Sequence, residues 1–497
     1  MTIPVGVEFE LTALMVSVNR EGKHNRGIPT AVLHYVLSGI DRDRCLKNFN
    51  AMTKTFDLIL RGGTIVTPGG EGLSDIGVRN GKIVEIGDLG SASAGEIYDA
   101  TGLHVLPGII DSQVHFREPG LEYKADLETE ARSAALGGVC AVFEMPNTNP
   151  STTTPDLLLD KLARAKGRMD VDHAFYAGAT KENPHLLAEM EQMPGCCGVK
   201  VFMGSSTGSL LVDDDEGVEA VLRAIKRRAA FHSEDEFRLK DRAALAETGN
   251  WHSHPVVRDV ETAVSSTTRL IRIARKVGKR IHVLHITTAE ELEILRDAKD
   301  VASVECLPQH LTLHAPDCYD RLGAYAQMNP PIREKRHQDA LWRALNAGIV
   351  DVMGSDHAPH TKEEKERPYP ASPSGMPGVQ TTVPLMLTHV ANGKLTLRRF
   401  VELMSSGPQR VFGIANKGRI AEGYDADFTV VDLKRKETIT TEWSAAKCGW
   451  TPFDGFEATG WPVATIIRGR TVMRDGEIVL KGQGEPVRFN ETLEPMA

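Results

Sequence analysis

The stretch Gly108-Ile-Ile-Asp-Ser-Gln-Val-His-Phe-Arg117 is a short apolar run that ends in side chains able to perform chemistry. Its apolar part predicts a buried strand over Ile109–Val114, which ends directly before His115. Seven similar runs follow at 141–145, 173–177, 199–202, 229–231, 281–284, 302–306 and 350–353, with helical patterns between them at 126–136, 155–166 and 261–277. Strands that alternate with helices predict an α/β protein with a parallel sheet, and eight strands predict a closed (β/α)8 TIM-like barrel.

The chain on either side of this region has a different pattern. Short strands separated by glycine-rich turns occupy 54–107, where Asn80-Gly81 between apolar runs predicts a hairpin, and a similar pattern returns near the C-terminus. We therefore expect a catalytic barrel of residues 108–419 and a smaller β-sandwich domain built from 52–107 and 420–497. Residues 1–51 show no clear strand or helix series, and we expect this extension to be dispensable, the alternative being a functional arm.

The composition restricts the class of partner. The net charge is −9, which argues against a general nucleic-acid binder but allows a small anionic substrate in a locally positive site. The seven cysteines are odd in number and form no Cys-x-x-Cys pair, as expected for reduced thiols in a cytoplasmic protein. No apolar run approaches the ~20 residues that cross a bilayer, so no membrane partner is expected.

Polar residues at the ends of five predicted strands form a candidate metal centre. They are His115, Lys200, His232, His285 and Asp356. A single histidine there would more simply be a hydrogen-bonded cap, but imidazoles together with a carboxylate are the ligands that Zn²⁺ prefers. In a barrel these ends meet on one face. His282 shares a strand with His285, and a spacing of three predicts that only His285 faces the barrel centre.

Three strings carry a resemblance to a known family. They are Gly108-Ile-Ile-Asp111 through His115-Phe-Arg-Glu-Pro-Gly120, Glu144-Met-Pro-Asn-Thr-Asn-Pro150, and Gly354-Ser-Asp-His-Ala-Pro-His360. With them, the chain from about Thr55 to Val479 resembles the amidohydrolase superfamily and, within it, the dihydroorotases. The resemblance implies reversible hydrolysis of L-dihydroorotate to N-carbamoyl-L-aspartate, a step of de novo pyrimidine biosynthesis.

The resemblance also implies the roles of the metal residues. His115 would bind the more buried of two zinc ions, and His232 and His285 would bind the second. Lys200 would be N-carboxylated and bridge the two ions, because a carbamate is an anionic oxygen ligand whereas an ammonium is not. Asp356 would bind the first ion and act as the catalytic proton shuttle.

A second set of residues would bind the substrate. By resemblance Arg117, Asn147 and His360 clamp the carboxylate of dihydroorotate, a task that suits the planar fork of arginine. Taken singly, these residues could instead form a surface salt bridge, a turn cap and a loop contact. Asn329 lies in a candidate lid, 315–332, and the glycine-rich segment Ser374-Gly-Met-Pro-Gly378 would close over the substrate ring.

The sequence departs from the family pattern at Gln113. The first motif normally has two histidines separated by one residue, and the first of them is replaced here by glutamine, a weaker ligand for zinc. The first metal site is therefore expected to be weak or absent. One alternative is a catalytically impaired dihydroorotase-like scaffold for aspartate transcarbamoylase, and another is an allantoinase- or hydantoinase-type cyclic amidohydrolase. A homo-oligomer is expected in each case.

Overall fold

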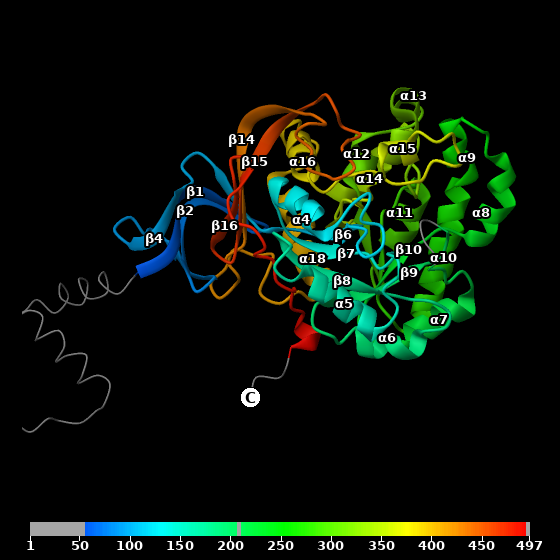
Figure 1. Ribbon diagram of the computed structural model, residues 1–497, viewed down its shortest axis with the longest axis horizontal. Coiled ribbons are helices and arrows are strands. Elements are labelled where there is room, and N and C mark those ends of the chain that lie inside the picture. The colour runs from blue at the N-terminus through cyan, green and yellow to red at the C-terminus, as the bar shows by residue number, and fades with distance from the viewer. Residues whose placement is uncertain (1–54, 206–209, 494–497) are drawn as a thin grey trace, which may run out of the picture. The chain divides into compact units, whose positions relative to one another are not determined.

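The computed structural model describes residues 55–205 and 210–493 of the chain (Figure 1). The extension 1–51 lies outside the described residues, so its predicted dispensability stays a prediction. The described parts of 56–90 and 94–493 belong to one compact unit, which contains the barrel and the second sheet. Within the described ranges, no helix combines the length and the apolar character needed to cross a membrane.

Eight parallel strands form a nearly closed barrel, as predicted. They follow one another in sequence order: β6 (Ile109–Val114), β7 (Val139–Glu144), β8 (Asp172–Gly178), β9 (Cys196–Phe202), β10 (Ala229–His232), β11 (Ile281–Val283), β12 (Ala302–Cys306) and β13 (Val352–Met353). A parallel bridge between Val114 and His357 brings the last strand back to the first. There the His115 N–H donates to the His357 carbonyl at 2.7 Å.

Helices surround the barrel strands (Figure 1). They are α4 (Leu127–Leu136), α5 (Pro155–Ala165), α6 (Pro184–Met190), α7 (Asp215–Ala224), α8 (Glu236–Arg242), α9 (His254–Val257), α10 (Val260–Val277), α11 (Ala289–Arg296), α12 (Pro308–Thr312), α13 (Asp317–Leu322), α14 (Lys335–Asn346), α15 (Lys362–Lys365), α16 (Thr382–Ala391), α17 (Leu397–Val401) and α18 (Gly407–Phe412). Side chains that accept backbone N–H groups start several of them, including Asp126 before α4 and Asp259 before α10.

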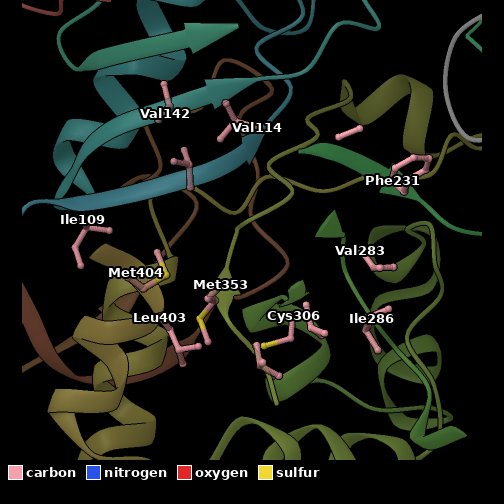
Figure 2. Close-up of a cluster of buried hydrophobic side chains, with 14 of the residues drawn as sticks. Ile109, Val114, Val142, Phe231, Val283, Ile286, Cys306, Met353, Leu403 and Met404 are labelled. Atoms are coloured by element: carbon pink, nitrogen blue, oxygen red, sulfur yellow. The ribbon is translucent and has the colours of Figure 1, made fainter. Parts of the chain in front are cut away.

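The main core lies where the helices pack on the outside of the barrel. Figure 2 shows part of it, with Val114 and Val142 from β6 and β7, Phe231 from β10, and Leu403 and Met404 from the segment before α18. All five side chains are buried. Burial of this apolar surface, at roughly 25 cal/mol per Å², fixes the strands and therefore the positions of the polar residues at their ends.

A second, mixed sheet is formed by both chain ends, which confirms the predicted composite β domain. Its strands are β1 (Thr55–Thr67), β2 (Gly70–Arg79), β3 (Lys82–Gly87), β4 (Ser93–Asp99), β5 (His104–Pro107), β14 (Phe428–Ile439), β15 (Phe456–Ile467), β16 (Arg470–Arg474) and β17 (Glu477–Ile478). Antiparallel pairing of β5 with β14 joins the two ends. Asn80 and Gly81 have φ of 52° and 73°, the left-handed conformation that the predicted β2–β3 hairpin requires.

Candidate active site

The residues predicted to bind metal meet at the carboxyl-terminal ends of the barrel strands. His115 follows β6, Lys200 lies in β9, His232 ends β10, and His285 and Asp356 follow β11 and β13. All five are buried, and together with Gln113 and Asn329 they line one small cavity.

The first pair of candidate ligands is His115 with Asp356. His115 Nδ1 lies 2.8 Å from Asn147 Oδ1, so Nδ1 carries the hydrogen and Nε2 presents a lone pair. This lone pair faces Asp356 Oδ1 at 3.2 Å. Burial lowers the pKa of His115 to about 4, which keeps the ring neutral at neutral pH. Two acceptors held face to face in this way leave a place for a cation.

Gln113 completes this side of the cavity. Its Nε2 donates to Asp356 Oδ1 at 2.9 Å, and its Oε1 is buried with no hydrogen-bond partner among the described residues. A buried amide oxygen without a partner costs roughly 1–3 kcal/mol, which a metal ion would offset. The Gln113 oxygen is therefore free to accept a metal ion, although it is a weaker donor to zinc than imidazole.

The second pair is His232 with His285. His232 Nε2 donates to Glu234 Oε2 at 2.8 Å, which leaves Nδ1 as an acceptor facing His285 Nε2 at 3.2 Å. Burial lowers the pKa of both imidazoles. Adjacent ligands of a tetrahedral zinc ion at ~2.0–2.1 Å are about 3.3 Å apart. Both candidate pairs are held at nearly this separation.

Lys200 lies in the same cavity as both pairs. Burial lowers the pKa of its amine to about 7, and a neutral amine is the form that reacts with carbon dioxide to give a carbamate. In the described part of the chain, no three His, Cys, Asp or Glu side chains are grouped to hold one ion. Each pair supplies two ligands, so a carboxylated Lys200 fits as the shared third ligand.

Three residues of the site have left-handed backbone conformations. Arg117, His285 and Asp356 have φ of 70°, 36° and 43°. For residues other than glycine this costs of order 1–3 kcal/mol each, and such strain is common at functional sites. At each of these positions the chain has just left a barrel strand, and the turn directs the side chain back over the barrel opening.

The expectation that His282 points away from the barrel centre is wrong. Its ring lies 5.3 Å from that of Phe412, which contacts Tyr176 in the core that fills the barrel, and its Nδ1 lies 2.8 Å from the Ser303 hydroxyl. The prediction assumed regular strand geometry through His285, whereas β11 ends at Val283. The left-handed turn at His285 brings both histidines inward.

Buried carboxylates support the site, and sequence reasoning gave them no role. Glu234 accepts from His232 and pairs with Arg258; burial alone would raise its pKa, but Arg258 and His232 lower it to about 2. Glu305 accepts the His285 N–H at 3.3 Å, and burial raises its pKa to about 8. A glutamate inside the apolar run 302–306 was the available signal for Glu305.

The residues predicted to clamp a carboxylate separate into two groups. Arg117 and His360 are brought together, with Arg117 Nη2 3.3 Å from His360 Nε2. Asn147 instead contacts the ring of His115, so in this structure it orients a candidate ligand. Asn329 lines the cavity, and its buried Oδ1 has no partner among the described residues.

A buried lysine ties together the two loops that cover the cavity. The Lys365 ammonium, at the end of α15, donates to the carbonyls of Gln327 at 3.1 Å, Pro373 at 2.9 Å and Gly375 at 3.0 Å. Gln327 precedes Asn329 in the candidate lid, and Gly375 lies in the glycine-rich segment. Lys365 therefore fixes both loops relative to one another.

The chain matches the amidohydrolase family over residues 104–472. A dihydroorotase of Methanosarcina acetivorans is 35% identical over 428 residues, which cover 83% of this chain and 91% of the relative. An L-hydantoinase of Paenarthrobacter aurescens is 32% identical over 452 residues, covering 86% and 96%. The solved structure of an L-hydantoinase (dihydropyrimidinase) from Arthrobacter aurescens superimposes with a TM-score of 0.83 at 30% identity, covering 87% and 99%. The relatives have different enzyme names, so the substrate must be argued from the site.

Proposed function

The chain belongs to the amidohydrolase family and is a cyclic amidohydrolase, and we propose that its reaction is the reversible hydrolysis of L-dihydroorotate to N-carbamoyl-L-aspartate. We further propose that this reaction serves de novo pyrimidine synthesis. The choice of this substrate over other cyclic amides depends on a single feature. Arg117 is buried and has no described carboxylate within ion-pair distance.

Arg117 is a buried cation that has no described carboxylate within ion-pair distance. Its side chain is 2% exposed, and no described carboxylate lies within ion-pair distance of it. Its Nε donates to the Pro359 carbonyl at 3.3 Å and its Nη2 to His360, while Nη1 makes no hydrogen bond to a described residue. Burial lowers its pKa to about 10. The carboxylates of Asp356, Glu144 and Glu364 stabilise its charge only from beyond ion-pair distance. A buried charge without a close partner is costly, so its presence supports a substrate that brings a carboxylate.

The metal-binding residues support hydrolysis. His115, Asp356 and Gln113 would hold one zinc ion, His232 and His285 the other, and a carboxylated Lys200 would bridge them. When bound, a pair of such ions lowers the pKa of water to ~7 and polarises the amide carbonyl. The neutral state of the imidazoles, which burial enforces, keeps their lone pairs available at neutral pH.

Asp356 is the residue that moves the proton. Its carboxylate lies beside His115 at the cavity, where it can accept the proton of the attacking water. As the ring amide C–N bond breaks, Asp356 gives this proton to the departing nitrogen, which becomes the ureido group of the product. In the reverse direction the same carboxylate takes the proton from the ureido nitrogen, and the ring closes with loss of water.

Hydantoinase-type activity is the second candidate, because the L-hydantoinase from Arthrobacter aurescens shares the fold over 87% of this chain. Hydantoin and dihydrouracil rings carry no carboxylate, so they would leave Arg117 unpaired. The third candidate is a scaffold for aspartate transcarbamoylase that hydrolyses cyclic amides slowly or not at all. Gln113 favours it, because glutamine in place of a ligand histidine binds zinc more weakly.

One experiment separates the three candidates. The full-length protein is purified, its zinc content is measured, and hydrolysis of dihydroorotate, hydantoin and dihydrouracil is compared at saturating zinc. We expect the zinc content to approach two ions per chain only at saturating zinc, because Gln113 weakens the first site, and we expect a clear preference for dihydroorotate. A preference for the uncharged rings would assign the chain to the hydantoinases. No turnover of any ring at any zinc loading would favour the scaffold.

A further inference from the structure

A second cavity lies at the end of the barrel opposite the candidate active site. It has a volume of about 250 Å³ and opens to solvent. Its walls come from the segments that lead into β10 and β11, residues 226–228 and 278–280, and from the end of α18. The candidate metal ligands follow the other ends of these strands, so the two cavities share no lining residue.

This cavity concentrates positive charge in an acidic protein. Its lining holds six basic side chains and one carboxylate, whereas the whole chain has a net charge of −9. Arg227 is engaged within the protein: it pairs with the carboxylate, Glu491, at 3.2 Å and donates to the Glu191 carbonyl at 2.8 Å. Arg410 lies 3.4 Å from Glu402. Carboxylates of the protein, Glu491 and Glu402, therefore neutralise the charges of these two arginines.

The other four cations have no ion-pair partner among the described residues. Lys226, Arg228, Lys279 and Arg280 form no ion pair with any carboxylate in the described ranges. Lys226 and Arg280 are exposed, and Arg228 is half-buried. Arg228 is nevertheless fixed in place, because its Nη1 donates to the Ile281 carbonyl at 2.9 Å and to the Ser303 hydroxyl at 2.7 Å. Burial and the neighbouring Arg280 charge lower the pKa of Arg228 to about 10, as expected where like charges are crowded.

We propose that this cavity is a binding site for a small phosphorylated molecule. Guanidinium groups and ammonium groups converging on one space match the charge and geometry of phosphate oxygens. Val411 and Phe412 give the cavity an apolar part, which suits an organic portion attached to the phosphate. The concave shape favours a small ligand over an extended polyanion such as nucleic acid, which usually binds a basic stripe.

The test uses inorganic pyrophosphate as the probe and isothermal titration of the full-length protein, with sodium chloride at matched ionic strength as the reference. Two double variants are compared with the wild type. Lys226→Glu/Arg280→Glu reverses two uncompensated charges of the cavity. Lys166→Glu/Lys394→Glu makes the same change in net charge at two exposed lysines that line no cavity described above and form no ion pair with a described residue.

We expect saturable pyrophosphate binding to the wild type, at least tenfold weaker binding to the cavity variant, and a change of less than twofold in the control variant. Extraction of metal by pyrophosphate would affect the three proteins alike, so the difference between them reports the cavity. Circular dichroism checks that the variants are folded, and Arg280→Gln, which removes one exposed charge, provides a milder second variant. Absence of saturable binding to the wild type, or equal weakening in both double variants, would overturn the proposal.

Discussion

Replacement of Arg117 by methionine tests the substrate assignment directly. Methionine keeps most of the apolar volume and removes the charge. Arg117 is 2% exposed and has no ion-pair partner among the described residues, so its guanidinium would meet the substrate carboxylate in a nearly closed site. Loss of such a contact costs ~2 to 5 kcal/mol, much of it from leaving the partner charge unpaired. At ~1.4 kcal/mol per factor of ten, kcat/KM for dihydroorotate should fall between about 30-fold and a few thousand-fold.

The assay compares kcat/KM for dihydroorotate with that for dihydrouracil, which has the ring but no carboxylate. We expect kcat/KM for dihydrouracil to change only a few-fold in Arg117→Met. Lys124→Met is the matched control, because Lys124 is also a buried cation beside His360 but already has a carboxylate neighbour, Glu364 at 3.5 Å. Lys124→Met should change the ratio of kcat/KM for dihydroorotate to kcat/KM for dihydrouracil only slightly.

Equal losses for both substrates in Arg117→Met would refute the reasoning. Arg117 would then be a structural residue that maintains the loop containing Pro359 and His360, to which it donates hydrogen bonds. The assignment of dihydroorotate as substrate would lose its main support, and the hydantoinase-type activity would become the better proposal.

The other predictions concern the metal centre, the loops and the extension. Lys200→Ala should abolish hydrolysis, with partial rescue by acetate or propionate as a substitute for the carbamate; full activity without rescue would contradict the bridging role. Gln113→His should raise affinity for the first metal about tenfold, or ~1.4 kcal/mol, in a chelator competition, and two ions that survive prolonged chelation in the wild type would contradict this argument. Lys365→Met should raise KM for dihydroorotate more than it lowers kcat, because both loops lose their common donor, whereas Lys362→Met on the exposed side of the same short helix should not. A chain that starts at Met52 should keep its activity and melting temperature, and a large drop in melting temperature would show that residues 1–51 stabilise the fold.

The barrel strands could be predicted because each is a buried apolar run between helical segments. The predicted bounds Ile109–Val114 and Ala302–Cys306 are those of β6 and β12, and the other strands differ by a few residues at their ends. The meeting of the candidate metal ligands could be predicted for the same reason, since strand ends meet at one face of a barrel. The predictions were less complete where the backbone left regular geometry, as at His285, which follows the end of β11.

The sequence by itself determined the α/β barrel, the composite sheet from both chain ends, and the set of residues that meet at the barrel opening. Local patterns suffice for this because hydrophobic periodicity fixes which side of a strand is buried. Only the tertiary structure decided that Asn147 contacts His115 and that Glu234 and Glu305 support the histidines. It also decided that Arg117 is buried without a carboxylate partner among the described residues. These properties depend on residues far apart in sequence, and on burial, which sets the energetic cost of each charge.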